Sequence, residues 1–210
     1  MDLVNELQIS VEQDDVLTVL RKARRLASKL DVDSISDWLS LEQNGYKRRE
    51  TVPSYRMLSG SLVYQTNGLV PAGYGRLVNG LLDVPGNICI SIPVYDSVAE
   101  ILQNLDGAGR KNQSLYIPAR DQEKIKAVFQ DDFVQQYTFH WKISPSAYGA
   151  IVEIVKDRVL DWACQLERSG VRGEGVSFDA REKAAANSIV FNITGSQIEQ
   201  LNNSGTNIRN

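Results

Sequence analysis

A carboxylate and a guanidinium lie close together in the sequence, with two aromatic residues beside them. Trp38 and Glu42 are four positions apart, so on a helix their side chains share a face. Tyr46 and Arg56 follow. Glu42 could pair with Arg56 and anchor the next segment, or the four residues could bind a small ligand. Because a single Glu–Arg pair has many structural uses, the sequence favours the structural interpretation.

A predicted helix over residues 14–30 presents a second group of charged side chains. Its polar face carries five cations: Arg21, Lys22, Arg24, Arg25 and Lys29. Three more follow the next predicted helix: Lys47, Arg48 and Arg49. Such a surface can meet a phosphate backbone or an acidic partner. The simpler interpretation is a solvated face balanced by nearby acids, which are Asp31, Asp33, Asp37 and Glu50.

His140 is the single histidine, so any Ser-His-Asp or Cys-His chemistry would have to use it. It falls on the polar side of a predicted strand, and the sequence holds no second histidine for a metal site. The sequence also lacks a G-x-S-x-G frame, a P-loop and an R-x-x-x-x-H pattern. We therefore predict no catalytic residues, no metal site and no cofactor.

The last part of the chain combines polar residues with spaced apolar ones. Among the apolar residues are Ile189, Phe191, Ile193, Ile198 and Leu201. An isolated strand of this kind cannot satisfy its backbone groups or bury its apolar side. It could fray, dock on its own domain, or pair with the same segment of another copy. Because Asn and Gln ladders stabilise stacked strands, the sequence slightly favours self-association.

The elements that position these residues indicate a mixed α+β fold. Apolar residues at helical spacing predict helices near residues 14–30, 35–43, 94–105, 121–129 and 144–169. Strict alternation predicts a strand at residues 137–143, and strand-like pieces lie at residues 62–64, 88–92 and 115–117. The fold would thus have an N-terminal helical part, a central Gly-rich β region, a long C-terminal helix and a β-forming polar tail. We expect one domain over residues 1–187 and a tail over residues 188–210.

Local signals predict where several of these helices begin and end. Ser34 is the expected N-cap of the helix at 35–43, and Gly45 is expected to end it. Ser144 and Pro145 should open the longest helix. A short Ala-rich helix should follow a cap at Ser177 or Asp179.

Composition narrows the classes of protein. The chain has a formal net charge of −3, which argues mildly against a constitutive nucleic-acid binder. Cys89 and Cys164 have apolar neighbours and no metal-binding spacing, so we predict two reduced core cysteines. No secretory signal and no membrane-spanning run is recognisable, so we expect a cytoplasmic protein.

Several motifs in order along the chain resemble those of the AbiTii family. Residues 38–46 resemble its W-x-x-x-E-L-x-G-Y signature, with Gln43 in place of the signature leucine. Residues 20–23 match an L-R-K-A helix, and residues 52–56 are similar to a following P-x-Y-R. Residues 155–167 and 170–178 are similar to a later helix and its link. The resemblance covers about residues 1–186.

The resemblance implies a role in abortive infection, in which an infected bacterium blocks phage production. It implies no settled enzymology and provides no catalytic residues. We therefore expect a non-enzymatic sensor or interaction and oligomerisation module, partnered by copies of itself and by a phage or host protein that the sequence does not identify. The alternative is a toxin-like nuclease or nucleic-acid-binding effector that uses the basic N-terminal helix, although nucleic acid is the less favoured partner. A membrane partner is not expected.

Overall fold

The computed structural model describes residues 2–48, 50–66, 91–107, 113–117, 119–128, 137–173 and 177–189. These residues form helices and short antiparallel strands, so the fold is mixed α+β, as the sequence predicts. The chain divides into two compact units. The first contains Met1–Tyr55, Tyr95–Ala99 and Val152–Asn210, and the second contains Arg56–Val94 and Glu100–Ile151.

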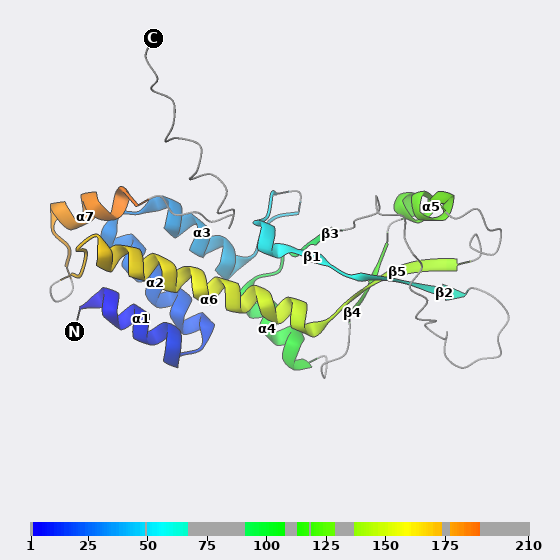
Figure 1. Cartoon of the computed structure of the whole chain (residues 1–210), viewed down its shortest axis with the longest axis horizontal. Helices are drawn as coiled ribbons and strands as arrows, with labels where there is room; N and C mark the ends of the chain where they lie inside the picture. Colours follow the sequence, from blue (N-terminus) through cyan, green and yellow to red (C-terminus); the bar gives the residue numbers. More distant parts are fainter. Residues whose placement is uncertain are drawn as a thin grey trace, which may run out of the picture. The chain divides into compact units, whose positions relative to one another are not determined.

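The first unit is helical. Its helices, drawn in Figure 1, are α1 (Leu3–Gln13), α2 (Val16–Leu30), α3 (Asp33–Asn44), α7 (Ala180–Asn187) and most of α6 (Pro145–Arg168). α2 contacts α1, α3 and α7. Buried apolar residues of α2, including Leu20, Ala23 and Leu30, belong to the core with Leu39 of α3 and Trp162 of α6. The i, i+3, i+4 spacing of these residues predicts both the helices and their buried faces.

Aspartates cap both ends of α2, Asp15 at its start and Asp31 at its end. The Asp15 side chain accepts hydrogen bonds from the backbone N–H groups of Leu17 and Thr18, both at 3.0 Å. At the other end, Asp31 takes the left-handed conformation with φ 56°. The Asp31 carboxylate also accepts a 2.7 Å hydrogen bond from Lys183 of α7. The Asn187 side chain donates to the Leu30 carbonyl oxygen at 3.2 Å. These contacts fasten α7 to the end of α2.

The predicted start of α3 is wrong, and its predicted end is right. The N-cap is Val32, which makes no side-chain capping bond, so Ser34 already lies inside the helix. Val32 is buried, and we attribute the earlier start to that burial. Gly45 ends α3 with φ 82°. A Cβ there would lie 2.8 Å from the Tyr95 carbonyl oxygen, so the position requires glycine for space as well as for conformation.

The second unit contains two small antiparallel sheets. The first pairs β1 (Met57–Ser59) with β3 (Ser91–Pro93). The second has the order β2 (Ser61–Thr66), β5 (Tyr137–Ile143), β4 (Gln113–Tyr116). The predicted strand at 137–143 is confirmed, and Phe139, Trp141 and Ile143 are its buried residues.

Two further helices, α4 (Val98–Gly107) and α5 (Ala119–Val128), complete the described elements. Ile125 of α5 belongs to a cluster with Ile117, Phe139 and Trp141. β4 pairs with β5 only from His140 onward, so Phe139 lies beyond the end of β4. There the Gln122 amide donates to the Phe139 carbonyl oxygen at 2.7 Å and accepts from the Phe139 N–H at 2.8 Å. The side chain thus takes the place of a neighbouring strand.

The long C-terminal helix is confirmed as α6, and Asp179 is confirmed as the cap of α7. Cys164 of α6 is half-buried and free. Cys89, Arg49 and most of the Gly-rich region lie outside the described residues, as do residues 190–210, so the predicted tail domain stays a prediction. In the part of the chain that the structure describes, no helix is long and apolar enough to cross a membrane.

Candidate functional site

The first unit brings Trp38, Glu42 and Tyr46 together with Tyr55. Oε1 of Glu42 accepts a 2.7 Å hydrogen bond from the Tyr46 hydroxyl and a 2.6 Å hydrogen bond from the Tyr55 hydroxyl. The indole Nε1 of Trp38 donates to the Tyr55 hydroxyl at 2.9 Å. We call Trp38, Glu42, Tyr46 and Tyr55 the carboxylate cluster.

The direction of these hydrogen bonds is fixed by what each group can do. An indole N–H can only donate, and a tyrosine hydroxyl has a single proton to give. The Tyr55 hydroxyl therefore accepts from Trp38 and donates to Glu42, so its single proton is already engaged. The bonds of Trp38 and Tyr55 thus form one relay that ends on Oε1 of Glu42, where Tyr46 also donates.

Three residues of the carboxylate cluster are buried, and Tyr55 is half-buried. The exposed fraction is 0% for Glu42, 2% for Trp38 and 7% for Tyr46. A general acid or base must come within hydrogen-bonding reach of its substrate. A carboxylate that is fully buried and bonded to two hydroxyls of its own chain is suited to holding segments together.

Arg158 of α6 adds a contact from the far end of the sequence. Its guanidinium carbon lies 5.2 Å from the centre of the Tyr55 ring, within cation–π range. The cluster thereby joins α3, the short 3-10 turn Ser54–Arg56 and α6. Tyr55 and Arg158 are not among the site residues predicted from the sequence. Tyr55 stands beside Arg56 in the P-x-Y-R motif, a usable signal, whereas the position of Arg158 has no local signal.

Arg56 belongs to the second unit and is also fully buried. Its Nη1 donates to the Val94 carbonyl oxygen at 3.2 Å, and the backbone N–H of Val94 donates to the Arg56 carbonyl oxygen at 2.9 Å. These bonds tie the start of β1 to the residue after β3. The pairing of Arg56 with Glu42 stays a prediction.

The basic residues of α2 divide into two groups. Lys22 is half-buried and forms ion pairs with Asp14 at 3.0 Å and Glu6 at 3.7 Å, and its bond to Asp14 raises the Lys22 pKa. Lys29 is half-buried as well. The other three, Arg21, Arg24 and Arg25, are exposed. Arg24 donates to the uncharged Gln43 side chain at 3.0 Å, so its positive charge is not neutralised there.

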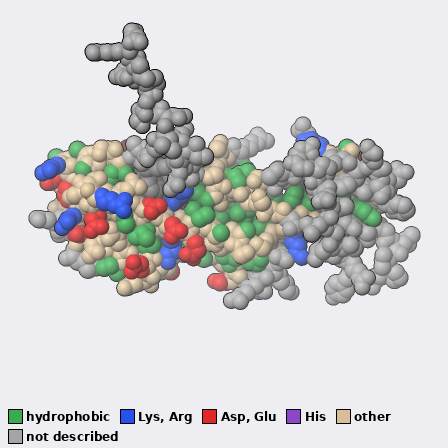
Figure 2. All heavy atoms as spheres, in the orientation of Figure 1, with side chains coloured by type: hydrophobic (Ala, Val, Ile, Leu, Met, Phe, Trp, Pro, Cys, Tyr) green, Lys and Arg blue, Asp and Glu red, His purple; other side chains and the backbone are tan. Residues whose placement is uncertain are grey.

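Other surfaces of the helical unit mix both signs of charge. Figure 2 shows Lys and Arg side chains interspersed with Asp and Glu over the visible face of this unit. On α6, for example, exposed Glu153, Asp157 and Asp161 share the helix with Lys156 and Arg168. α2 differs because no acidic residue occurs between Val16 and Leu30.

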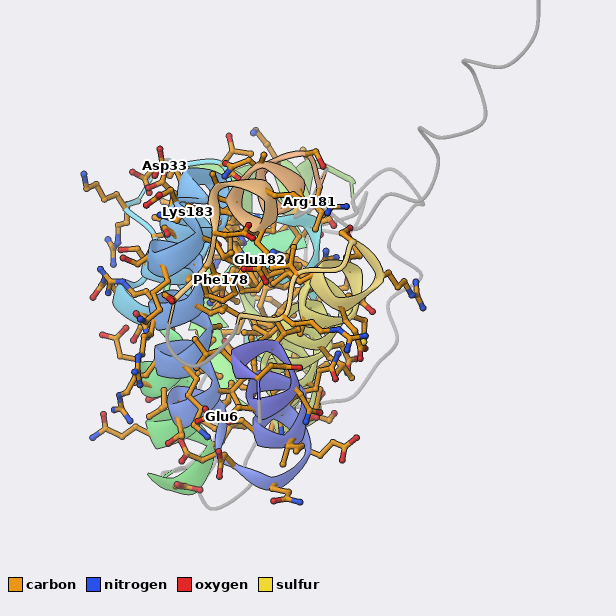
Figure 3. All side chains as sticks on the ribbon, turned by 90° about the vertical axis from the view of Figure 1, so that its left-hand side faces the viewer. Glu6, Asp33, Phe178, Arg181, Glu182 and Lys183 are labelled. Atoms are coloured by element: carbon orange, nitrogen blue, oxygen red, sulfur yellow. The ribbon has the colours of Figure 1, made fainter. Side chains whose placement is uncertain are left out.

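A hollow of about 490 Å³ lies where α6 ends and α7 begins. The carboxylate of Glu182, labelled in Figure 3, is one of its lining groups. Glu182 accepts hydrogen bonds from the backbone N–H groups of Gly173 (2.8 Å), Arg172 (3.0 Å) and Asp179 (3.0 Å). These bonds, the one from Gly173 above all, lower the Glu182 pKa. Glu182 therefore binds the backbone of Arg172 and Gly173 to the first turn of α7, and it completes a capping box with Asp179.

The other predicted site residues are His140 and the apolar residues of the tail. His140 is half-buried in the central strand β5, opposite Val63 and Tyr116. Among the described residues, no three His, Cys, Asp or Glu side chains are placed to hold a metal ion. Ile189 is half-buried at the end of α7, whereas Phe191, Ile193, Ile198 and Leu201 lie outside the described residues.

Comparison with known proteins identifies one family. The family model for AbiTii matches residues 2–191, which include both units' described elements and the whole carboxylate cluster. No curated protein matches the chain, and no solved structure matches it.

Proposed function

The chain belongs to the AbiTii family of abortive-infection proteins in phage defence, and we propose that it acts there as a non-enzymatic interaction module. The observation that carries this proposal is the complete burial of the Glu42 side chain. Glu42 is the carboxylate of the predicted ligand cluster, yet its side chain is fully buried. It accepts hydrogen bonds from Tyr46 and Tyr55 of its own chain. A non-enzymatic module acts by binding other molecules.

The proposal is tested by separating folding from phage protection. Glu42→Gln keeps an oxygen acceptor for the two tyrosine hydroxyls and removes the charge that acid–base chemistry would need. His140→Asn keeps a polar side chain in β5 and removes the only imidazole. A non-enzymatic module predicts that bacteria making either variant, where it is folded, resist phage as well as bacteria making the original chain.

The corresponding biochemical measurement is turnover of RNA and nucleotides by the purified chain. We expect no turnover above that of a buffer blank. Turnover that both Glu42→Gln and His140→Asn leave intact would point to a different active site. Turnover that either variant abolishes would place chemistry at that residue. Both results contradict a non-enzymatic module.

The second part of the proposal is self-association through residues 188–210. Ile189, Phe191 and Ile193 occupy every second position of a segment rich in Asn and Gln, which suits pairing of strands between copies. Truncation after Asn187 should lower the mass measured by light scattering. Truncation after Leu201 is the matched control, because it removes only polar residues and Ile208 and should leave the mass unchanged. An equal mass for all three chains would exclude the tail as the interface.

A nucleic-acid-binding effector is the second candidate function. The exposed arginines of α2 favour the binding part of that function, because Arg21 and Arg25 form no ion pair among the described residues. They do not supply a nucleophile or a general base. The arginines therefore support binding of nucleic acid and not its cleavage.

A further inference from the structure

We propose that the exposed side of α2 binds the phosphate backbone of a nucleic acid through Arg21, Arg24 and Arg25, with Ser28 beside them. These four residues are called the arginine tract. The proposal concerns a partner class that the proposed function leaves open, and it does not depend on self-association or on the absence of catalysis.

The helix places the four side chains of the arginine tract on one side. Arg21 and Arg25 are four residues apart, Arg21 and Arg24 three, and Arg25 and Ser28 three, which are the spacings of neighbours on a helix surface. All four residues are exposed. Among the described residues, neither Arg21 nor Arg25 forms a hydrogen bond or an ion pair through its side chain.

The acids nearest in sequence to α2 are already engaged elsewhere. Asp14 accepts from Ser10 at 2.6 Å and from Lys22 at 3.0 Å. Asp15 caps α2 through Leu17 and Thr18, and Asp31 pairs with Lys183. Of these, Asp15 interacts with Arg21 only through a weak long-range attraction, the smallest of the causes that lower the Asp15 pKa. The arginine tract thus keeps its positive charge.

The chemistry of the arginine tract favours a phosphate backbone over an acidic protein. A protein interface needs a desolvated centre with apolar or aromatic anchors. The apolar residues of α2 in this stretch, among them Ala23, Leu26 and Ala27, are buried in the core and cannot serve as anchors. A phosphate backbone needs only cations, and guanidinium groups bind phosphate in a bidentate manner.

The length of the arginine tract limits its affinity. From Arg21 to Ser28 the helix rises about 10 Å along its axis, so the tract can meet about three phosphates. Release of about three counterions predicts that affinity for a single strand falls roughly 20-fold when salt rises from about 50 to about 200 mM. Binding should also be independent of base sequence, because no side chain of the tract is placed to read bases in a groove.

The test is fluorescence anisotropy of the full chain with three labelled probes: a single-stranded RNA, a single-stranded DNA and a duplex DNA. We expect binding of at least one probe at low salt, with the salt dependence given above. The variant Arg21→Glu/Arg25→Glu should weaken that binding at least about tenfold, since two contacts become repulsions. The probe that binds best distinguishes RNA from DNA and single strands from duplexes.

The matched control is Arg168→Glu/Arg181→Glu, which changes the net charge by the same amount at exposed positions of α6 and α7. It should leave binding within about twofold of the original chain, because screening limits distant charges. Absence of binding to every probe at low salt would overturn the proposal. So would equal losses in the two double variants, or tighter binding to polyglutamate than to any nucleic acid, which would indicate an acidic protein partner.

Discussion

The carboxylate cluster and the arginine tract use charged residues in opposite ways, although both stand out in the sequence. In the cluster, Glu42 is withdrawn from solvent and bonded to Tyr46 and Tyr55. In the tract, Arg21 and Arg25 remain exposed, with no side-chain partner among the described residues. A charge whose partners are supplied by its own chain contributes to stability. A charge left exposed in a group of like sign is available to another molecule.

This comparison makes different predictions for the two regions. Changes in the carboxylate cluster should alter the free energy of unfolding, because they leave buried polar groups without partners. Changes in the arginine tract should alter binding and leave stability nearly constant. The following variants test that division, beginning with the largest expected effect.

Glu42→Ala should have the largest effect on stability. It removes the acceptor of two tyrosine hydroxyls and leaves space in the core, so we expect a loss of about 3 kcal/mol. Urea denaturation followed by circular dichroism measures this loss. Glu42→Gln, which preserves shape and an acceptor, should cost about 1 kcal/mol. If Glu42→Ala and the original chain unfolded at the same urea concentration, the carboxylate cluster would not stabilise the fold.

The two tyrosines of the carboxylate cluster should differ. Tyr55→Phe removes a hydroxyl that bonds to both Trp38 and Glu42, so it should cost about 2 kcal/mol. Tyr46→Phe removes one bond and should cost about 1 kcal/mol. Because both hydroxyls meet the same oxygen of Glu42, the double variant should deviate from additivity. Equal effects of the two single changes would contradict the relay from Trp38 through Tyr55.

Glu182 should give the chain a measurable sensitivity to acid. Its pKa is lowered in the folded state, so its stabilisation is complete above the pKa of the unfolded chain and is lost as pH falls through the folded value. The free energy of unfolding should therefore decline below about pH 4.5. Glu182→Gln should cost about 1 kcal/mol at neutral pH, a modest figure because the side chain is partly exposed, and should flatten the decline.

The acid dependence should not vanish in Glu182→Gln. The pKa values of Asp14 and Asp15 are also lowered, chiefly by hydrogen bonds from Ser10 and Thr18. These two aspartates remain in the variant and keep part of the slope. Thermal unfolding at several pH values between neutral and acidic measures both chains. Identical pH profiles for the two chains would show that Glu182 does not act as a brace.

Arg21→Glu/Arg25→Glu should have the smallest effect on stability. Both positions are exposed and glutamate is a good helix former, so the free energy of unfolding should change by less than about 0.5 kcal/mol. Urea denaturation with the same protocol as for Glu42→Ala allows direct comparison. A loss comparable to that of Glu42→Ala would mean that the arginines support the fold, and the contrast between the two regions would fail.

The elements that the sequence predicts well are those specified by local pattern. The alternation from Tyr137 to Ile143 and the helical spacing within α2 and α6 each depend on residues close in the chain. The end of α3 at Gly45 is predicted for the same reason, and the cap of α7 is one of the two residues, Ser177 and Asp179, that the sequence offers. The capping box with Glu182 has a local signal as well, the D-x-x-E spacing, and could have been recognised.

The rest depends on contacts between distant residues. Arg158 meets Tyr55 across about a hundred positions of sequence, and no periodicity encodes that distance. The start of α3 was misplaced because a capping preference at Ser34 competes with burial of Val32, which only the packed structure reveals. Likewise, the sequence identified the cations of α2 but could not show that Lys22 is paired while Arg21 and Arg25 stay exposed.

The contrast between the two regions is tested most directly by phage protection in bacteria that make Glu42→Gln at a temperature where this variant is folded. An account in which the buried carboxylate only ties α3 to its neighbours predicts survival equal to that conferred by the original chain. Loss of protection by a variant that is folded and equally abundant would show that the charge of Glu42 takes part in function.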